Sequence, residues 1–240
     1  MRDYDARIVD LYDGDNPAGD DHEYYRALAE SIGARSILDV GCGTGILTAT
    51  LAAPGRTVVG VDPSQAMITY ARKRPGSEHV TWIEGDIRSV AEGQFDLIVM
   101  TGNVAQHIPD PVWARMLVDV RALANDGAVL AFESRNPAAQ AWKSWHQPEP
   151  TERDTAHGPL QEWYEAIEQG KGRVLLRAHN LFVDTEDYVI QEDLLTFRTA
   201  ETIRHQLAQS GWDVTATWGD WHRTPFSGKE PVMVFEARAV

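Results

Sequence analysis

Residues 36–48 carry the feature that most restricts the fold: a short apolar run, three glycines at alternate positions, and then a second apolar segment. The run at 37–40 predicts a buried strand, and Gly41, Gly43 and Gly45 follow it directly. Because glycine has no Cβ atom, the chain can turn sharply here and a ligand can lie against the main chain. The pattern predicts an α/β protein with a ligand site at the end of its first strand.

An acidic residue stands at the end of the next apolar run. Residues 57–61 read as a second strand, and Asp62 follows it, about 20 residues after Gly41. A carboxylate at this position can accept hydrogen bonds from two ribose hydroxyl groups. The alternative is that Asp62 caps the helix expected from residue 64.

The spacing of the glycines favours a ligand without phosphate. Dinucleotide-binding chains carry G-x-G-x-x-G at this point, whereas this sequence carries G-x-G-x-G. Asp39, two residues before the first glycine, would repel a pyrophosphate and would suit an ammonium group. A nicotinamide-dependent oxidoreductase is therefore the weaker interpretation.

The segment Asp39 to Gly45, Asp-Val-Gly-Cys-Gly-Thr-Gly, resembles the first motif of class I S-adenosylmethionine-dependent methyltransferases. Their ligand carries a sulfonium, an amino-acid tail and an adenosine, and no phosphate. The resemblance implies S-adenosylmethionine as the cofactor. It also implies a Rossmann-like, mostly parallel seven-stranded sheet whose last two strands form a hairpin. It is specific over residues 36–62 and loose over the rest of the chain.

The composition narrows the class of partner. A net charge of −14 over 240 residues, with no run of lysine or arginine, argues against nucleic acid as a partner. The single cysteine, Cys42, excludes an internal disulfide and a cysteine-rich metal cluster, and we expect no metal. We find neither a signal peptide nor the roughly 20 apolar residues of a membrane span. We therefore expect a soluble, cytoplasmic protein with no membrane partner.

Strand and helix patterns alternate along the first 134 residues. Strands are expected at 36–41, 57–62, 80–85, 95–102 and 127–134, and helices at 1–12, 22–32, 45–53, 64–74 and 109–124. Such alternation predicts a doubly wound, mostly parallel sheet covered by helices on both faces.

The pattern changes after residue 134. Residues 135–158 have no clear period, and antiparallel strands are expected at 161–166, 173–183 and 188–198, before a helix at 199–210 and strands at 213–220 and 231–239. We expect a cofactor-binding domain of residues 1–134 and 199–240. Residues 135–198 would be an antiparallel β insertion after the fifth strand that caps the substrate side.

The resemblance implies a row of cofactor-binding residues at the strand ends: Asp39, Gly41, Cys42, Gly43, Gly45, Asp62, Pro63, Met67, Asp86, Ile87, Thr101, Gly102 and Tyr12. Asp86 would accept from the adenine amino group and Ile87 would pack on the base; a surface turn is the alternative for Asp86. Thr101 and Gly102 would contribute main-chain atoms. Core packing is the alternative for Met67 and Tyr12.

His107, just after the fourth predicted strand, is the candidate catalytic residue. An imidazole titrates near neutral pH, so it can act as a base or line the transfer site; capping the helix at 109 is the alternative. The candidate acceptor-binding residues are Asn103, Arg135, Asn136, Trp145 and His179. Aromatic side chains with a few polar groups build small-molecule pockets, so the cluster as a whole indicates such a site; ordinary core and sheet packing is the alternative for each residue taken singly.

These features together predict methyl transfer from S-adenosylmethionine to nitrogen or oxygen of a small molecule. After the fourth predicted strand the chain reads Thr-Gly-Asn-Val at 101–104, which departs from the N-P-P-Y run of enzymes that methylate DNA bases or glutamine. The layout resembles bacterial enzymes that methylate sugar amines or other small metabolites. The alternative is a non-catalytic sensor or assembly protein of the same fold, and a homodimer is a possible assembly.

Overall fold

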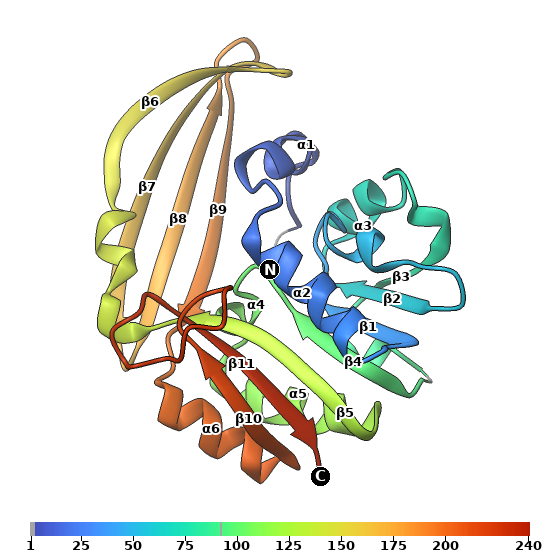
Figure 1. Cartoon of the computed structure of the whole chain (residues 1–240). Coiled ribbons are helices and arrows are strands. Elements are labelled where there is room, and N and C mark those ends of the chain that lie inside the picture. The colour runs from blue at the N-terminus through green and yellow to red at the C-terminus, as the bar shows by residue number, and fades with distance from the viewer. Residues whose placement is uncertain (1–2, 92) are drawn as a thin grey trace.

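The computed structural model describes residues 3–91 and 93–240, which form two β-sheets with flanking helices (Figure 1). The larger sheet has seven strands in the order β10-β11-β5-β4-β1-β2-β3. These strands are β1 (Ser36–Val40), β2 (Thr57–Asp62), β3 (Val80–Glu84), β4 (Phe95–Met100), β5 (Ala124–Arg135), β10 (Trp212–Trp218) and β11 (Val232–Ala239). Residues 1 and 2 of the expected helix at 1–12 lie outside the described residues.

The strand directions confirm the predicted fold class. Strands β3, β2, β1, β4 and β5 pair in parallel, whereas β11 is antiparallel to both β5 and β10. The chain runs outward from β1 through β2 to β3 and then returns to the other side of β1 as β4. Open α/β sheets bind ligands at such a reversal, beyond the carboxyl ends of the strands.

Alternate residues of the strands feed two apolar cores, one on each face of the larger sheet. Leu38 of β1 packs in a core shared with α5 (Asp110–Ala122) and α6 (Ala200–Gln209). Ile37 packs on the opposite face with residues of α2 (Asp20–Ser31). Burial on both faces explains why these strands read as continuous apolar runs in the sequence.

The second sheet is antiparallel and follows β5, as predicted. Its order is β6-β7-β8-β9, with β6 (Gln147–Thr155), β7 (Gly158–Gly170), β8 (Arg173–Phe182) and β9 (Asp187–Thr196). In Figure 1 it stands beside the carboxyl edge of the larger sheet, with β9 nearest to α1 (Ala6–Asp15) and α4 (Val104–His107). The insertion therefore overhangs the edge at which the ligand site was predicted.

Three local predictions were wrong. No α-helix forms at 45–53: the only helical turn is η1 (Thr48–Leu51), because the glycine loop extends to Gly45. Strand β6 was missed because it contains Pro148 and Pro150, which a strand tolerates only at a sheet edge, where β6 lies. Strand β5 begins at residue 124, earlier than the expected 127.

The remaining elements are short connections at the edges of the sheets: α3 (Gln65–Ala71), η2 (Ser77–His79), η3 (Ile87–Ser89), η4 (Pro137–Ala139) and η5 (Ala141–Ser144). Ser64 caps α3 as predicted, since its hydroxyl accepts from the amide of Met67 at 3.1 Å. None of the helices described has the length and apolar character that crossing a membrane requires.

Candidate cofactor and active site

The glycine loop leaves one position open toward the site. Gly41, Gly43 and Gly45 all have positive φ, of 75°, 53° and 73°. A Cβ atom on Gly41 would lie 2.5 Å from the side chain of Val104, and one on Gly45 would lie 2.4 Å from the ring of Trp82. On Gly43 it would meet no described atom within 4 Å. The first and third glycines therefore allow close packing, while the second leaves bare main chain facing free space.

Asp39 presents a buried carboxylate oxygen without a partner. Its side chain is 1% exposed, and its Oδ2 accepts from the Thr48 hydroxyl at 2.7 Å. The other oxygen, Oδ1, has no hydrogen-bond partner among the described residues. Burial raises the pKa of Asp39 to about 7, opposed by the Thr48 hydrogen bond. A cation beside Oδ1 would relieve this desolvation, so the position suits the ammonium group of an amino-acid tail.

Asp62 braces the loop from the next strand end. Its Oδ2 accepts from the amide of Gly43 at 2.9 Å and its Oδ1 from the amide of Ser64 at 2.8 Å. Burial raises its pKa, and these two amides oppose the shift. Each carboxylate oxygen has two lone pairs, so Asp62 retains acceptor capacity for hydroxyl groups. Since Ser64 supplies the cap of α3, the structure does not need Asp62 as that cap.

The predicted adenine-side residues differ in exposure. Asp86 caps η3 and pairs with Arg88, which lowers the pKa of its carboxyl, and its side chain is 49% exposed. Ile87 and Met67 are buried, whereas Pro63 is exposed. Asp86 can rotate toward a ligand at little cost, but in this structure its partner is Arg88.

The end of β4 is shaped by a buried glutamate. Gly102 and Asn103 both have positive φ, and the amide of Asn103 donates to Oε1 of Glu133 at 2.5 Å. Tyr25 of α2 donates its hydroxyl to the other oxygen of Glu133. Burial raises the pKa of Glu133 to about 7. The turn that carries Thr101 is thus held by β5 and α2 together.

Tyr12 of α1 and Tyr4, which precedes the helix, are partly buried phenols near charged groups of the site. Burial raises the pKa of Tyr12, and the charges of Asp62 and Asp193 raise it further. Burial and the charge of Asp193 also raise the pKa of Tyr4. Both phenols therefore remain protonated near neutral pH and can donate hydrogen bonds where the two sheets meet.

His107 lies against the insertion. Its Nδ1 is 3.4 Å from Oδ1 of Asp193 on β9, with the two side chains 40% and 20% exposed. The charge of His107 is among the smaller influences that oppose the raised pKa of Asp62. His107 ends α4 and does not cap α5, where Pro109 is the N-cap residue.

The guanidinium of Arg135, at the end of β5, is the cationic group of the predicted acceptor site. Its guanidinium lies 4.8 Å from the ring centre of Trp145, and burial lowers its pKa. The Arg135 amide donates to Oε1 of Gln106 at 2.7 Å, and Nε2 of Gln106 is buried without a described partner. Arg135 and Trp145 therefore form a planar, cationic surface, and the charge of Arg135 slightly opposes the raised pKa of Tyr12.

Two predicted acceptor-binding residues lie elsewhere or are otherwise occupied. The amide nitrogen of Asn136 donates to the carbonyl groups of Gly228 and Glu230, and its oxygen caps η4. His179 pairs across the strands with Trp163. Its alternation along β8 places it on the face opposite to Phe182, which contacts Arg7 of α1. The structure does not bring His179 together with the other site residues.

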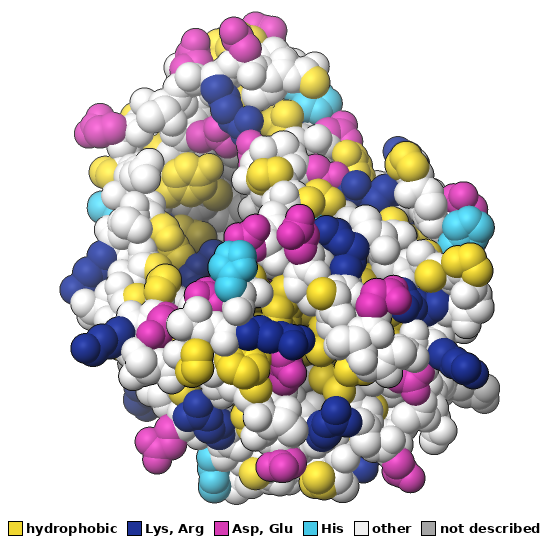
Figure 2. Space-filling model, in the orientation of Figure 1, with side chains coloured by type: hydrophobic (Ala, Val, Ile, Leu, Met, Phe, Trp, Pro, Cys, Tyr) yellow, Lys and Arg dark blue, Asp and Glu magenta, His cyan; other side chains and the backbone are white. Residues whose placement is uncertain are grey.

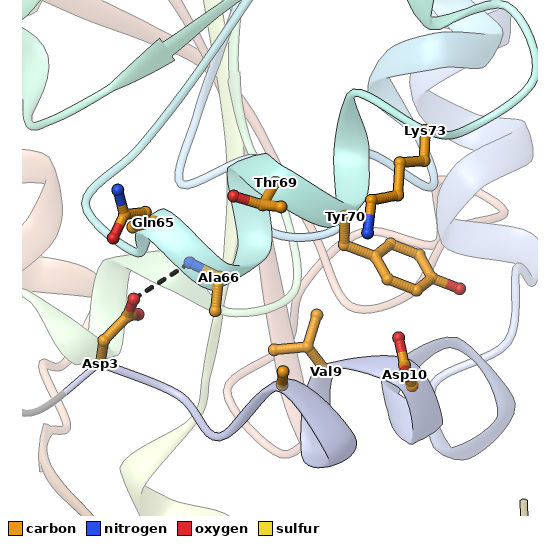
Figure 3. Close-up of a pocket in the computed structure, with 9 residues that line it drawn as sticks. Asp3, Val9, Asp10, Gln65, Ala66, Thr69, Tyr70 and Lys73 are labelled. Carbon is orange, nitrogen blue, oxygen red and sulfur yellow. Dashed lines mark hydrogen bonds between the residues drawn. The ribbon is translucent and has the colours of Figure 1, made fainter.

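A hollow separates the insertion from the larger sheet in the space-filling view, with hydrophobic side chains on its wall and charged ones around it (Figure 2). A separate cavity of about 220 Å³ lies between α1 and α3. Asp3, Val9, Tyr70 and Lys73 are among its lining residues, and Asp3 accepts from the amide of Ala66 (Figure 3). None of the predicted site residues lines that cavity.

Sequence reasoning missed Glu133 and Asp193. Glu133 directly follows the apolar run 128–132 in the buried part of β5, and a carboxylate there is a signal that could have been noticed. Asp193 follows another acid, Glu192, and only the register of β9 shows which of the two faces the site. No described group of three or more His, Cys, Asp or Glu side chains could hold a metal ion.

Comparison with known proteins agrees with this geometry. Residues 37–127 match the family model for a methyltransferase domain. Glycine N-methyltransferase of Oryctolagus cuniculus is 28% identical over 152 residues, which cover 55% of this chain and 52% of that protein. Ubiquinone biosynthesis O-methyltransferase of Acinetobacter baylyi is 31% identical over 117 residues, covering 45% and 48%. The chain spans about half the length of the curated relatives it matches.

Solved structures extend the likeness to the whole fold. The sugar N-methyltransferase from Streptoalloteichus sp ATCC 53650 superposes with a TM-score of 0.74 at 21% identity, over 98% of this chain and 94% of that one. The superposed length includes the second sheet, which the family model at 37–127 does not reach. Residues 37–127 thus match a methyltransferase domain, and the chain as a whole has the fold of the solved methyltransferase structure.

Proposed function

We propose that this protein transfers the methyl group of S-adenosylmethionine to a nitrogen or oxygen atom of a small-molecule acceptor. The observation that carries the proposal is the unpartnered, buried Oδ1 of Asp39, close to a glycine loop that is open at Gly43. Asp62 links the same loop to the end of β2. The ammonium group of the cofactor would pair with Asp39, and its amino-acid tail would lie along the main chain at Gly43. Its ribose would bind Asp62.

The individual binding roles follow from the same edge of the sheet. Asp39 would attract the ammonium group and Tyr12 would donate to the carboxylate of the amino-acid tail. Asp62 would accept from the ribose hydroxyls. Asp86 and Ile87 would hold the adenine, and Asp86 must first turn from Arg88. The other proposed contacts are the main chain of Gly41, Cys42, Gly45, Thr101 and Gly102 and the side chains of Pro63 and Met67.

The cofactor, when bound, supplies a methyl group on a positively charged sulfur. The chain has then to place the acceptor atom in line with that methyl group and to exclude water. Arg135 and Trp145 would position the acceptor, together with Asn103, whose Oδ1 is buried without a described partner. His107 would take the proton that the acceptor loses.

Residues 135–198 would act as the cap over the acceptor. Support comes from the side chains that this segment directs at the larger sheet, Trp145 beside Arg135 and Asp193 beside His107. Two sheets would thus share the acceptor, while the cofactor would contact mainly the larger one. Substrate choice would then depend on the insertion.

Calorimetry with S-adenosylmethionine and with NAD tests the cofactor assignment. Binding of the first and not of the second is the expected result, and the reverse would overturn it. The proteins named above are, by their names, a glycine N-methyltransferase, an O-methyltransferase of ubiquinone biosynthesis and a sugar N-methyltransferase. An acceptor panel should therefore contain small amines and small hydroxyl compounds. Tight binding without transfer to any acceptor would leave the sensor or assembly role.

A homodimer would cover an apolar surface on the insertion. We define the outer face as the side of β7–β9 that carries Trp163, His179 and Tyr188. Its exposed apolar residues are Ile167, Tyr188, Ile190 and Leu194, between 36% and 50% exposed. Its main charges are paired locally, since Arg177 contacts both Glu165 and Glu192. A second copy could therefore pack there without isolating a charge.

The size of the outer face suits a small two-fold interface. Three strands about 4.8 Å apart and about 33 Å long present about 500 Å² per copy, so a pair buries about 1,000 Å². Analytical ultracentrifugation should show a dimer that Ile190→Asp dissociates. Val118→Asp, at a similarly exposed residue of α5, is the matched control and should leave the dimer intact. A monomeric native protein would exclude this assembly.

The cytoplasm is the proposed location of the protein, and cell fractionation would test it.

A further inference from the structure

The insertion contributes one carboxylate to the centre of the site. Along β9, Glu192 is opposite Arg177 and pairs with it at 2.6 Å, on the outer face. Asp193 is the next residue, so its side chain points to the opposite face, toward the larger sheet. There its Oδ1 lies 3.4 Å from Nδ1 of His107. Strand periodicity thus separates two adjacent acids into a surface pair and a site residue.

Asp193 has no competing partner in the structure. Among residues 3–91 and 93–240, His107 is the one side chain that forms an ion pair with it. The charge of Asp193 also raises the pKa values of Tyr4 and Tyr12. Its side chain is 20% exposed, so its charge is only partly screened by water.

We propose that Asp193 is a positioning residue for His107. Asp193 accepts a hydrogen bond from Nδ1–H and so holds the neutral imidazole in the tautomer whose Nε2 lone pair is free. A small rotation of either side chain closes the 3.4 Å separation to hydrogen-bond length, as is common when a site is filled. This inference rests on the proposed methyl transfer and assigns to the insertion a part in proton removal as well as in substrate binding.

The path of the proton during methyl transfer gives His107 and Asp193 their separate roles. The lone pair of the acceptor nitrogen or oxygen forms a bond to the methyl carbon, and the electrons of the broken carbon–sulfur bond return to sulfur. The proton lost by the acceptor moves to Nε2 of His107. The resulting imidazolium carries one positive charge beside the carboxylate of Asp193, which stabilises it without itself taking the proton.

Nitrogen NMR of the imidazole rings tests the pair in the protein without cofactor or acceptor. In the native protein the His107 signals should show hydrogen on Nδ1; the spectrum of His107→Gln identifies them. Asp193→Asn can donate its amide hydrogen to Nδ1 and should move the ring hydrogen to Nε2. An identical tautomer in the native protein and in Asp193→Asn would overturn the proposal.

Kinetics provide the second test. Asp193→Asn should lower kcat about 100-fold or more and leave the KM for S-adenosylmethionine unchanged. Combined with His107→Gln it should add little to the loss that His107→Gln causes alone, because the two residues act as one unit. Asp193→Glu should restore part of kcat. Glu192→Gln, the adjacent acid on the outer face, is the control and should retain native kcat.

The outcomes separate this inference from the proposed function. If the native protein transfers no methyl group but the tautomer depends on Asp193, the pair stands and the proposed function fails. If transfer occurs and Asp193→Asn changes only the KM for the acceptor, Asp193 is a binding residue and the positioning role is wrong. Fully additive losses in the double variant would contradict it as well.

Discussion

At the scale of single residues, the site depends on carboxylates kept out of water. Asp39 and Glu133 are each about 1% exposed, and burial raises the pKa of both to about 7. A carboxylic acid whose pKa is higher in the folded than in the unfolded protein binds more protons when folded. Its contribution to stability is therefore largest at low pH and is lost as the pH rises toward the folded-state pKa. A cation bound beside Asp39 would stabilise its charged form and so offset this loss of stability.

Asp39→Asn should make the protein more stable and less able to bind. Between pH 5 and pH 8, the free energy of unfolding of the native protein should fall by about 1–3 kcal/mol more than that of the variant. Asparagine can still accept from Thr48 but carries no charge for an ammonium group, so S-adenosylmethionine should bind more weakly. Urea unfolding at both pH values and calorimetry at pH 8 measure these effects. Parallel pH curves for the two proteins would contradict the assignment.

Asp62→Ala should weaken binding of S-adenosylmethionine by about 1–3 kcal/mol, because it leaves the ribose hydroxyls and the amide of Gly43 without their acceptor. Asp62→Asn, which keeps an acceptor oxygen, should lose less. Asp126→Ala, at the opposite edge of the sheet, is the control. Dissociation constants from calorimetry decide the matter, and an unchanged value for Asp62→Ala would remove Asp62 from the site.

At the scale of elements, α1 joins both sheets by polar contacts. Toward the larger sheet, Asp13 accepts from the hydroxyl of Thr44 in the glycine loop and pairs with Arg74. Toward the insertion, Arg7 pairs with Asp187 at 2.8 Å and lies over the ring of Phe182. Ion pairs and hydrogen bonds at the surface are weaker and more sensitive to salt than apolar packing. The polar contacts of α1 with both sheets are therefore expected to weaken with added salt.

Arg7→Ala should release α1 without unfolding the protein. Loss of its contact with Asp187 should lower local stability only slightly, because the pair is exposed to solvent. Limited proteolysis between α1 and α2 should then be about threefold faster, and 0.5 M salt should accelerate cleavage of the native protein in the same way. Arg115→Ala, which removes an exposed pair on α5, serves as the control. Equal cleavage rates in both variants would show that Arg7 does not hold α1.

At the scale of the whole molecule, burial is concentrated in the larger sheet. Strands β1 and β4 are central, and Ile37, Leu38, Leu97 and Ile98 have no exposed surface. The insertion has a smaller core around Trp142 and Phe197, and most of β6 is exposed. We therefore expect the larger sheet to be more stable than the insertion.

Hydrogen exchange should follow this division. Amides of β1 and β4 should exchange slowest, at rates set by global unfolding, and those of β6 fastest among the strands, because it is an exposed edge. Mass spectrometry of exchanged peptides measures both. Protection of β6 equal to that of β4 would mean that the two sheets open as one unit.

Much of the fold could be predicted because its signals are local. Continuous apolar runs mark the parallel strands, Ser64 marks the start of α3, and the glycine loop marks the reversal point of the sheet. Strand β6 could not be found in this way, because Pro148 makes its sequence unlike a strand and only its position at a sheet edge permits it. The pairing of β6 depends on β7, which a local pattern does not contain.

The sequence by itself determined the family of the fold and the chemistry of the loop, since Asp39, the three glycines and Asp62 lie on one crossover whose spacing is read directly from the chain. Only the tertiary structure decided which distant side chains share the site. The period of a strand is two, so Asp193 faces His107 while His179 lies on the outer face, and that choice depends on the register of β8 and β9. Register is settled by packing of the whole sheet.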